Sequence, residues 1–467
     1  MGLAANGRAA QAAGMQTTEA HQRLDQFRQE VYRAVLGHRK DSLFERLAAV
    51  LTSAGRMPLV RLSLAGAFRR CWSRIPDALA AGHGAVAARP TLLPPHLPAA
   101  QVGDRPLWAV AGTIWPRPAA RTSPERTYGR QPMAARADAV LVPSWEYQWV
   151  VAPPAQGGRW VLPLEVSRRG PAAPPPTDLA IRQLVAVLPA VPASLGRPVV
   201  TFDSQDCPTT LARARRPIDC LVRLSRRRRL YRAPGPYRGR RRRPIHGLVF
   251  RTHHPATHGP PDREARGHDA THGTVTVPVW HGLHPQGGHD APFTVVRMQV
   301  ERLPHKGTRP GPRWLAWGRS AGDAGPLPDD LLLRWRWYGQ RCTVAHGCRF
   351  AKQELGWTAL RRRDPATADR CSWLLALAFW QLWLARPLVA DARRPWERPL
   401  PPNRLTPGRV RRALPTLFAQ IDPPARAPQR RGNAPGRHLG HGPGAHPRYA
   451  VVRRHPKTHR RRRNRAA

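Results

Sequence analysis

The chain has 467 residues, enough for two or three domains with a sizeable core. Lys and Arg number 77 against 29 Asp and Glu, which gives a formal net charge of +48 and a pI of about 11.8. A compact protein needs a polyanion to screen that charge, so nucleic acid is the expected partner. The alternative is that GC-rich coding DNA or a decayed reading frame has raised the arginine count.

The cysteines and the apolar segments indicate the compartment. Six cysteines are scattered without a CxxC pair, which argues against both a disulfide framework and a zinc ribbon. The N-terminus lacks the apolar core of a signal peptide. The most apolar run, 373–385, is too short to cross a bilayer, and we expect a buried helix there. We therefore expect a cytoplasmic protein, located with the nucleoid and without a membrane partner.

The first 82 residues predict a small helical region. Residues 1–20 read as a loose leader, and apolar residues then recur with helical spacing over 24–35. Ser42 and Glu45 form a capping-box pattern that predicts the start of a second helix, and the apolar segment 60–72 predicts a third. Such a region is typical of a DNA-binding unit and equally of a scaffold.

From residue 106 the pattern changes to short β-type runs. Three strands are followed by a helix and two more strands, and the fourth strand delivers Asp203 at its C-terminal end. This order indicates an α/β domain with a mixed sheet. The expected strands are 107–115, 145–152, 159–167, 197–206 and 218–225, with a helix over 177–188 capped by Thr177 or Asp178.

The next part of the chain combines basic runs with further strands. The arginine runs 226–229 and 240–243 bracket a loop that carries Tyr231 and Tyr237. Basic residues interleaved with aromatic rings suit phosphate contacts and base stacking, and a disordered basic loop is the alternative. Three later runs predict an all-β insertion, with strands over 273–280, 293–303 and 312–318.

Candidate metal ligands occur in two places. Histidines concentrate in the insertion, among Gly and Pro in expected loops, at His253, His254, His258, His268, His272, His281, His284 and His289. Their spacing matches no metal-ligand pattern, so we do not assign zinc there. Cys342 and His346 have the spacing of two ligands on one helix face, but no second pair accompanies them, so we favour a structural role.

The segment 333–357 contains none of the chain's 53 prolines and predicts one helix. Five of its residues recur at three- and four-residue spacing and so share one stripe, which is basic with a small residue at its centre: Tyr338, Arg341, Ala345, Arg349 and Lys352. On spacing alone, the alternative is a solvated charged face.

Three segments carry a resemblance to a known family. They are AVAGTIWPRP (109–118) followed by TSPER (122–126), then TFDSQD (201–206), and the stripe, which matches a Tyr-x2-Arg-x3-Glu-x6-Lys signature at Tyr338, Arg341, Ala345 and Lys352. In that order they resemble a bacterial insertion-sequence transposase of the DDE class, with a ribonuclease H-like catalytic domain. The resemblance covers roughly residues 105–420.

This resemblance implies metal-dependent DNA cleavage and strand transfer. Two Mg²⁺ ions activate the nucleophile and stabilise the leaving oxygen, and three carboxylates from two strands and a helix hold the ions. The implied cofactor is Mg²⁺, the implied partners are DNA and the transposon ends, and a homo-oligomer stays open. The implied DNA-binding residues, which would hold the DNA backbone beside the ions, are Tyr338, Arg341, Arg349 and Lys352.

The chain departs from that family at two of the three acidic positions. Ala111 occupies the position of the first Asp and Ala345 that of the signature Glu, so Asp203 is the remaining catalytic and metal-ligating candidate. Glu354 lies on the opposite helix face, and Asp206 comes from the same strand end as Asp203. One carboxylate cannot hold two Mg²⁺ ions, so we predict that this copy is catalytically impaired.

The predicted fold is α/β, a ribonuclease H-like mixed sheet flanked by helices, with an all-β insertion and an N-terminal helical region. Its segments are a loose leader (1–20), a helical region (21–82), a linker (83–104), the first part of the catalytic domain (105–225), a basic loop and β-rich insertion (226–325), the second part of the catalytic domain with a core helix from about Asp369 to Pro387 (326–400), and a basic, largely disordered Pro/Arg-rich tail (401–467). The predicted function is a DDE transposase with impaired catalysis. The alternatives are a non-catalytic DNA-binding protein and a decayed product that does not fold.

Overall fold

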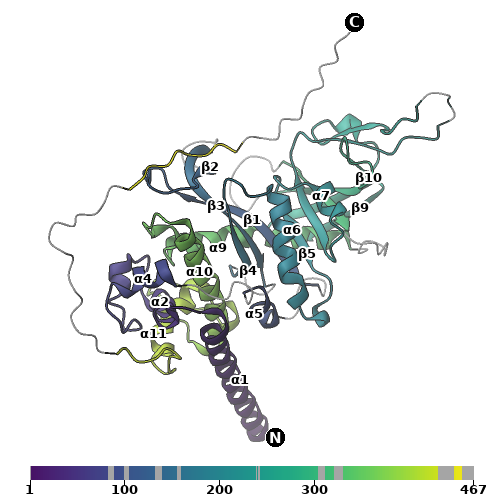
Figure 1. Cartoon of the computed structure of the whole chain (residues 1–467). Helices are drawn as coiled ribbons and strands as arrows, with labels where there is room; N and C mark the ends of the chain where they lie inside the picture. Colours follow the sequence, from purple (N-terminus) through teal and green to yellow (C-terminus); the bar gives the residue numbers. More distant parts are fainter. Residues whose placement is uncertain are drawn as a thin grey trace.

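One large sheet organises the chain, with helices on both of its faces (Figure 1). The fold was obtained as a computed structural model, which describes residues 2–82, 89–98, 105–131, 139–154, 159–237, 239, 242–302, 311–319, 330–429 and 446–454.

The centre of the sheet has the predicted strands. β1 (Leu107–Pro116), β3 (Val140–Ala152) and β4 (Leu162–Arg169) are antiparallel neighbours, while β5 (Val199–Phe202) and β6 (Asp219–Leu224) run parallel to β1. Their order is β4-β3-β1-β5-β6. The predicted fold class, a ribonuclease H-like mixed sheet flanked by helices, is confirmed.

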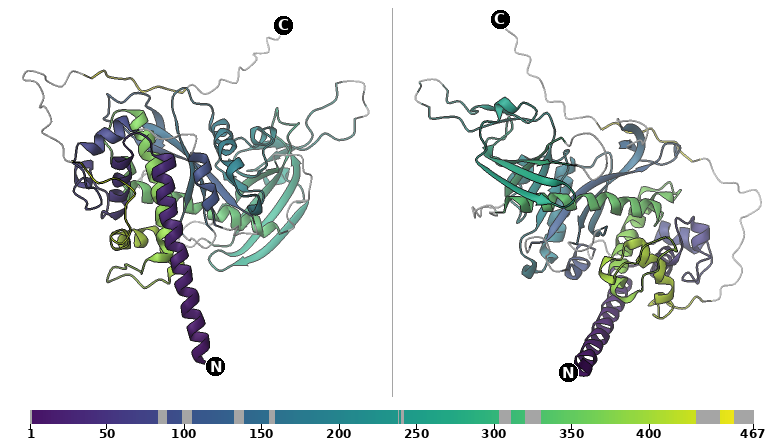
Figure 2. Two further views of the ribbon diagram at one scale, coloured as in Figure 1. Left: turned by 60° about the horizontal axis from the view of Figure 1, so that its bottom comes forward. Right: turned by 180° about the vertical axis from the view of Figure 1, so that it is seen from behind.

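The all-β insertion is not a separate layer but an extension of this sheet. β12 (Arg313–Arg319) pairs antiparallel with β6, and β11 (Phe293–Val300), β10 (Gly273–Leu283) and β9 (Arg263–Asp269) follow outward. These outer strands curve away from the central strands in the left view of Figure 2. β2 (Thr127–Gln131) closes the opposite edge on β3.

Part of the basic loop between β6 and the insertion forms strands. β7 (Arg229–Tyr231) and β8 (Val249–Arg251) form a two-stranded sheet. The Tyr231 ring is buried there and stacks on His246, with ring centroids 4.5 Å apart. The interpretation of Tyr231 as a base-stacking residue is therefore wrong, because its face is already occupied. Several residues of the second arginine run lie outside the described part of the chain.

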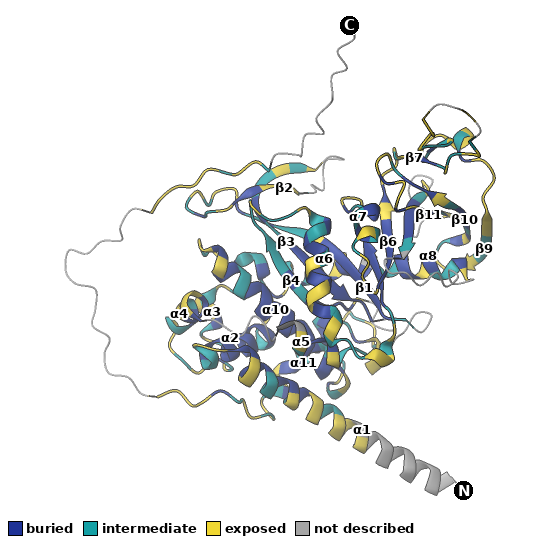
Figure 3. Cartoon of the chain, turned by 45° about the vertical axis from the view of Figure 1, so that its right-hand side comes forward, coloured by how far each residue is buried: buried dark blue, intermediate teal, exposed yellow. Residues whose placement is uncertain are grey.

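Helices cover the two faces of the sheet unequally. Tyr147 and Gln148 are successive residues of β3, so their side chains point to opposite faces. Tyr147 donates to Asp369 of α10 (Pro365–Ala385), and Gln148 donates to the Pro176 carbonyl of α6 (Pro176–Val187). α10 begins four residues earlier than predicted, because Asp364 caps it. Figure 3 shows α10 and the central strands as buried.

The prediction of one helix over 333–357 is wrong. The segment forms α8 (Leu331–Gln340) and α9 (Cys342–Gln353), which meet at Arg341. At this joint the Val344 amide donates to the Arg341 carbonyl, a bond that reaches back three residues instead of four. α9 then ends before Gly356, which adopts a left-handed φ of 70°.

The N-terminal part is more helical than expected. α1 begins at Gly2, inside the expected loose leader, runs to Glu30 and extends away from the body (Figure 1). α2 (Lys40–Thr52) follows without the expected capping box. The reason is that the Glu45 side chain is buried and pairs with Arg69 at 2.8 Å, so it does not bond back to the helix start. The predicted third helix over 60–72 is only α3 (Leu59–Leu62).

Two segments expected to be irregular contain packed helices. α4 (Arg74–Ala81) precedes the expected linker, whose described part holds α5 (Arg89–Leu92) and buries Leu93. The expected tail contains α11 (Pro407–Phe418), because three residues at helical spacing, Val410, Leu414 and Leu417, bury an apolar face against α2 and α10. The last described residues of the tail, 446–454, run beside β2 through a bridge between Thr127 and Val452.

Nowhere in the described ranges does a helix have both the length and the apolar character needed to cross a membrane.

Arg411 tests whether the tail is part of the fold. Its side chain is 5% exposed and donates to the carbonyl oxygens of Val50, Gly55 and Glu354 at 2.7–2.9 Å. Arg411→Ala leaves these buried acceptors unpaired, so we expect a loss of roughly 3 kcal/mol in the free energy of unfolding. Urea unfolding measures this loss, with exposed Arg404→Ala as the charge-matched control. Equal stability of the two variants would place α11 outside the cooperative core.

Candidate active site

The site lies where the parallel strands end. β1 and β5 pair in register from Leu107 with Val199 to Ala109 with Thr201. Continuing this register by two residues places Ala111 alongside Asp203, on the same face of the sheet. Ala111, the predicted position of the first acidic residue, and Asp203 are therefore neighbours. Ala111 is 8% exposed, so the position is largely enclosed.

Both oxygens of the Asp203 carboxylate are engaged by the protein. Arg341 Nη2 lies 3.0 Å from Oδ2, and the Ser204 amide donates to Oδ1 at 2.8 Å. Arg341 stands at the joint between α8 and α9, so the ion pair connects that joint to the end of β5. Ala345 follows one turn later on α9 and is exposed. The partner role of Arg341 was not evident from spacing, because it depends on contact between distant segments.

The other members of the predicted stripe do not share one surface. Lys352 Nζ donates to Thr113 Oγ1 at 2.7 Å, on the same face of β1 as Ala111. Burial lowers the pKa of Lys352. Tyr338 is only 5% exposed and packs in a core cluster with Leu107, so its ring is not presented to DNA. Burial is also the main cause of its raised pKa.

Arg349 faces a different part of the molecule. It lines a groove of about 530 Å³ between α9 and α11, together with Arg159 and His346. The pKa of His346 is lowered by burial first and then by the charges of Arg159 and Arg349. Arg159, His346 and Arg349 thus lie close together in the groove beside α9. The groove also contains Glu354, which pairs with Arg411 at 3.6 Å.

The Asp206 carboxylate is hydrogen-bonded to α6. Thr177 Oγ1 donates to its carboxylate at 3.2 Å and accepts from the Cys207 amide at 2.9 Å. Thr177 is therefore not the N-cap of α6, and neither is Asp178, since Pro175 holds that position. Burial raises the pKa of Asp206 to about 6. The carboxyl is held in place by α6 and does not converge with Asp203 on a common ligand position.

The residues present do not fit a pair of Mg²⁺ ions. Such a pair needs several carboxylate oxygens converging on one point. Within the described ranges, no three side chains of His, Cys, Asp or Glu are grouped to hold a metal. Asp203, the remaining candidate ligand, is already paired with a guanidinium. The Arg341 guanidinium is therefore paired with the carboxylate that a metal ion would need as a ligand.

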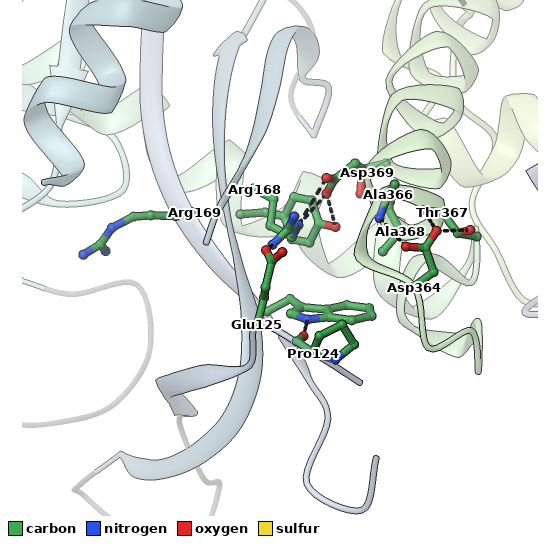
Figure 4. A network of polar contacts seen from close by, with 12 residues as sticks. Pro124, Glu125, Arg168, Arg169, Asp364, Ala366, Thr367, Ala368 and Asp369 are labelled. Atoms are coloured by element: carbon green, nitrogen blue, oxygen red, sulfur yellow. Dashed lines mark hydrogen bonds and ion pairs between the residues drawn. The ribbon is translucent and has the colours of Figure 1, made fainter. Parts of the chain in front are cut away.

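The motif TSPER takes part in a network of polar contacts that holds the structure together (Figure 4). Glu125 adopts a left-handed φ of 56° and pairs with Arg168 of β4 at 2.6 Å. Arg168 Nε also lies 2.9 Å from Asp369 of α10, which accepts from the Tyr147 hydroxyl. Burial raises the pKa of both Tyr147 and Asp369. This network fastens the loop after β1 to β4 and α10, and Glu125 contributes no carboxylate beside Asp203.

Asp206→Asn tests the electrostatic cost of the buried carboxyl. Because its folded pKa of about 6 lies above the unfolded value of 3.8, ionised Asp206 destabilises the fold above about pH 6, and this destabilisation disappears as the pH falls towards 4. An Asn amide oxygen can still accept from Thr177. We expect the variant to gain about 3 kcal/mol over the natural chain at neutral pH and little near pH 4.

Urea unfolding of both proteins across this pH range gives the measurement. The same exchange at exposed Asp422 is the control. A gain that does not change with pH would mean that charge burial at Asp206 is not its cause.

Comparison with known proteins identifies the family of the chain. The family model "DDE superfamily endonuclease" matches residues 32–284, more than half of the chain, and this range includes β1, β5 and β6 but ends before α8 and α9. A cryo-EM structure of piggyBac transposase in a synaptic complex with hairpin DNA is similar over 80% of this chain and 70% of that chain, with 9% identity and a TM-score of 0.36, a likeness too low to carry an argument. No curated protein matches. On the family match, the chain belongs to the DDE superfamily endonucleases.

Proposed function

We propose that this chain descends from the transposase of a bacterial insertion sequence and binds DNA without cutting it in a metal-dependent reaction. The observation that carries the proposal is the state of Asp203: Ala111 lies beside it in register, and Arg341 occupies its carboxylate at 3.0 Å. Because we propose that the protein binds DNA, we also propose that it is located with the chromosome in the bacterial cytoplasm.

The chemistry of the reaction explains why this state matters. In-line attack on a phosphodiester needs one metal ion to activate the nucleophile and another to stabilise the leaving oxygen. Mg²⁺ dehydrates reluctantly and binds weakly to a single carboxylate. Here it would also have to displace Arg341 from Asp203. We therefore propose that Mg²⁺ binding is weak and that strand transfer does not occur.

The basic surface supports DNA as the retained partner. Lysine and arginine exceed the acidic residues by 48. Arg159 and Arg349 line the groove beside α9, and in the described part of the chain neither forms an ion pair with a carboxylate. Guanidinium groups in this state match phosphate oxygens in geometry and charge. We propose that DNA passes along this side, with transposon ends as the preferred sequence and a second copy of the chain at the other end.

Restoring the acidic positions tests the loss of catalysis. We expect the natural chain to leave a plasmid carrying the terminal repeats intact in Mg²⁺, because it cannot hold two ions. Ala111→Asp together with Ala345→Glu should produce Mg²⁺-dependent nicking, visible on an agarose gel. The control adds Asp203→Asn to this pair and should be silent. Robust nicking by the natural chain would rule out the proposed impairment.

Salt dependence tests the DNA groove. If Arg349 contacts a phosphate, Arg349→Ala should reduce the slope of log K against log salt by about 1. Fluorescence anisotropy with a labelled duplex measures the slope, and Arg130→Ala, an equal loss of an exposed charge on β2 outside the groove, should leave it nearly unchanged. The groove has no role in binding if the two variants behave alike.

A further inference from the structure

The row of residues across the strand ends continues beyond Asp203. β5 and β6 pair from Val199 with Asp219 to Phe202 with Val222, so the next pair brings Arg223 alongside Asp203. Reading across the sheet, Ala111, Asp203 and Arg223 stand in one row, with neighbouring strands about 4.8 Å apart. Arg341, at the joint between α8 and α9, pairs with the middle member, Asp203. The Asp203 carboxylate thus has one guanidinium paired with it, and the strand positions on either side of it in the row are Ala111 and Arg223.

A cavity of about 510 Å³ opens beside this row. Its wall begins at Ser204, directly after Asp203, and includes Arg223, Arg226 and Arg313. Met298, Trp314 and Trp335 line its apolar side. The cavity lies between β6, the insertion strands β11 and β12, and α8. It is separate from the groove beside α9 that holds Arg349.

The charges in this cavity are unbalanced. Within the described ranges, Arg223, Arg226 and Arg313 form no ion pair with a carboxylate, and no Asp or Glu lines the wall. Arg223, Arg313 and Arg341 all lie close enough to Tyr338 to lower the pKa of its phenol, against the larger effect of burial. Guanidinium groups crowded together repel one another unless an anion lies between them, and an apolar wall strengthens both effects.

We infer that the place where the family holds metal ions has become an anion site in this chain, which takes a DNA phosphate directly on Arg223 and Arg313 without a metal ion. The inference rests on the proposed DNA binding and adds its place and mode. An arginine fork matches two oxygens of a phosphate, whereas a metal ion needs the carboxylates that are missing. Asp203 is then a neutraliser of Arg341 and not a metal ligand.

A metal site and an anion site predict opposite effects of Asp203→Asn on DNA binding. At a metal site, Asp203→Asn removes a ligand and weakens any binding that depends on Mg²⁺. At an anion site, the same exchange removes a negative charge next to the phosphate and releases Arg341 to contact it. Because Asp203 is partly exposed, solvent screens the effect, and we expect DNA binding to tighten by roughly fivefold.

The experiment measures binding of a short labelled duplex by anisotropy, once in EDTA and once in Mg²⁺ at equal ionic strength. Arg223→Ala and Arg313→Ala should each weaken binding by about tenfold in both buffers. Arg227→Ala is the matched control, since Arg227 directly follows Arg226 of the cavity wall, is exposed and does not itself line the cavity. Thermal unfolding of each variant verifies that the fold is intact. Inorganic phosphate is then added as a competitor. It should displace the duplex if the cavity is a site for free phosphate, and should leave binding nearly unchanged if the cavity is a site for DNA phosphodiesters.

The outcomes separate the inference from the proposed function. Binding that persists in EDTA, weakens in the two cavity variants and tightens in Asp203→Asn agrees with the anion site. If the cavity variants match Arg227→Ala while the natural chain still binds DNA, the inference is overturned and the DNA-binding function stands. A requirement for Mg²⁺, or weaker binding by Asp203→Asn, also overturns it. If the natural chain binds no duplex at all, the proposed function fails first.

Discussion

The ion pair between Arg341 and Asp203 is the contact on which the rest of the site depends. It joins the end of a central strand to the point where α8 and α9 meet, so it fixes both the position of α9 and the charge beside Ala111. At these strand ends the chain places guanidinium groups beside a single carboxylate. We propose that the sheet and the helices of the family have been kept while the charge at this site has changed from negative to positive.

The central sheet could be predicted from the sequence, because β1, β3 and β5 contain short runs of apolar, aromatic and β-branched residues, which are a local signal of buried strands. The joint at Arg341 could not, since helical periodicity continues through it and the break accompanies a contact with Asp203 from another part of the chain. For the same reason Tyr338 and Arg349, which share a stripe on an ideal helix, lie in a core and beside a groove. The site residues themselves were chosen by resemblance, and their roles stay predictions.

Composition also overstated how much positive charge is free for a partner. Several arginines are buried and donate to backbone carbonyls, as Arg411 does to α2 and as Arg117 of the WPR segment does to Leu360. α11 was missed because its prolines and arginines are typical of a disordered tail, although its apolar residues have helical spacing. Among the arginines that line the two cavities, Arg159, Arg349, Arg223 and Arg313 form no ion pair with a carboxylate within the described ranges, and their charge is available to DNA.

The most direct test of the account is metal binding itself. Titration of the natural chain with Mn²⁺, an oxygen-seeking substitute for Mg²⁺, and detection of the free ion by electron paramagnetic resonance count the sites without any assay of DNA cleavage. The account predicts no saturable binding in the natural chain and a clear gain when Ala111→Asp and Ala345→Glu are introduced together. Tight, stoichiometric binding of Mn²⁺ by the natural chain, lost in Asp203→Asn, would contradict it.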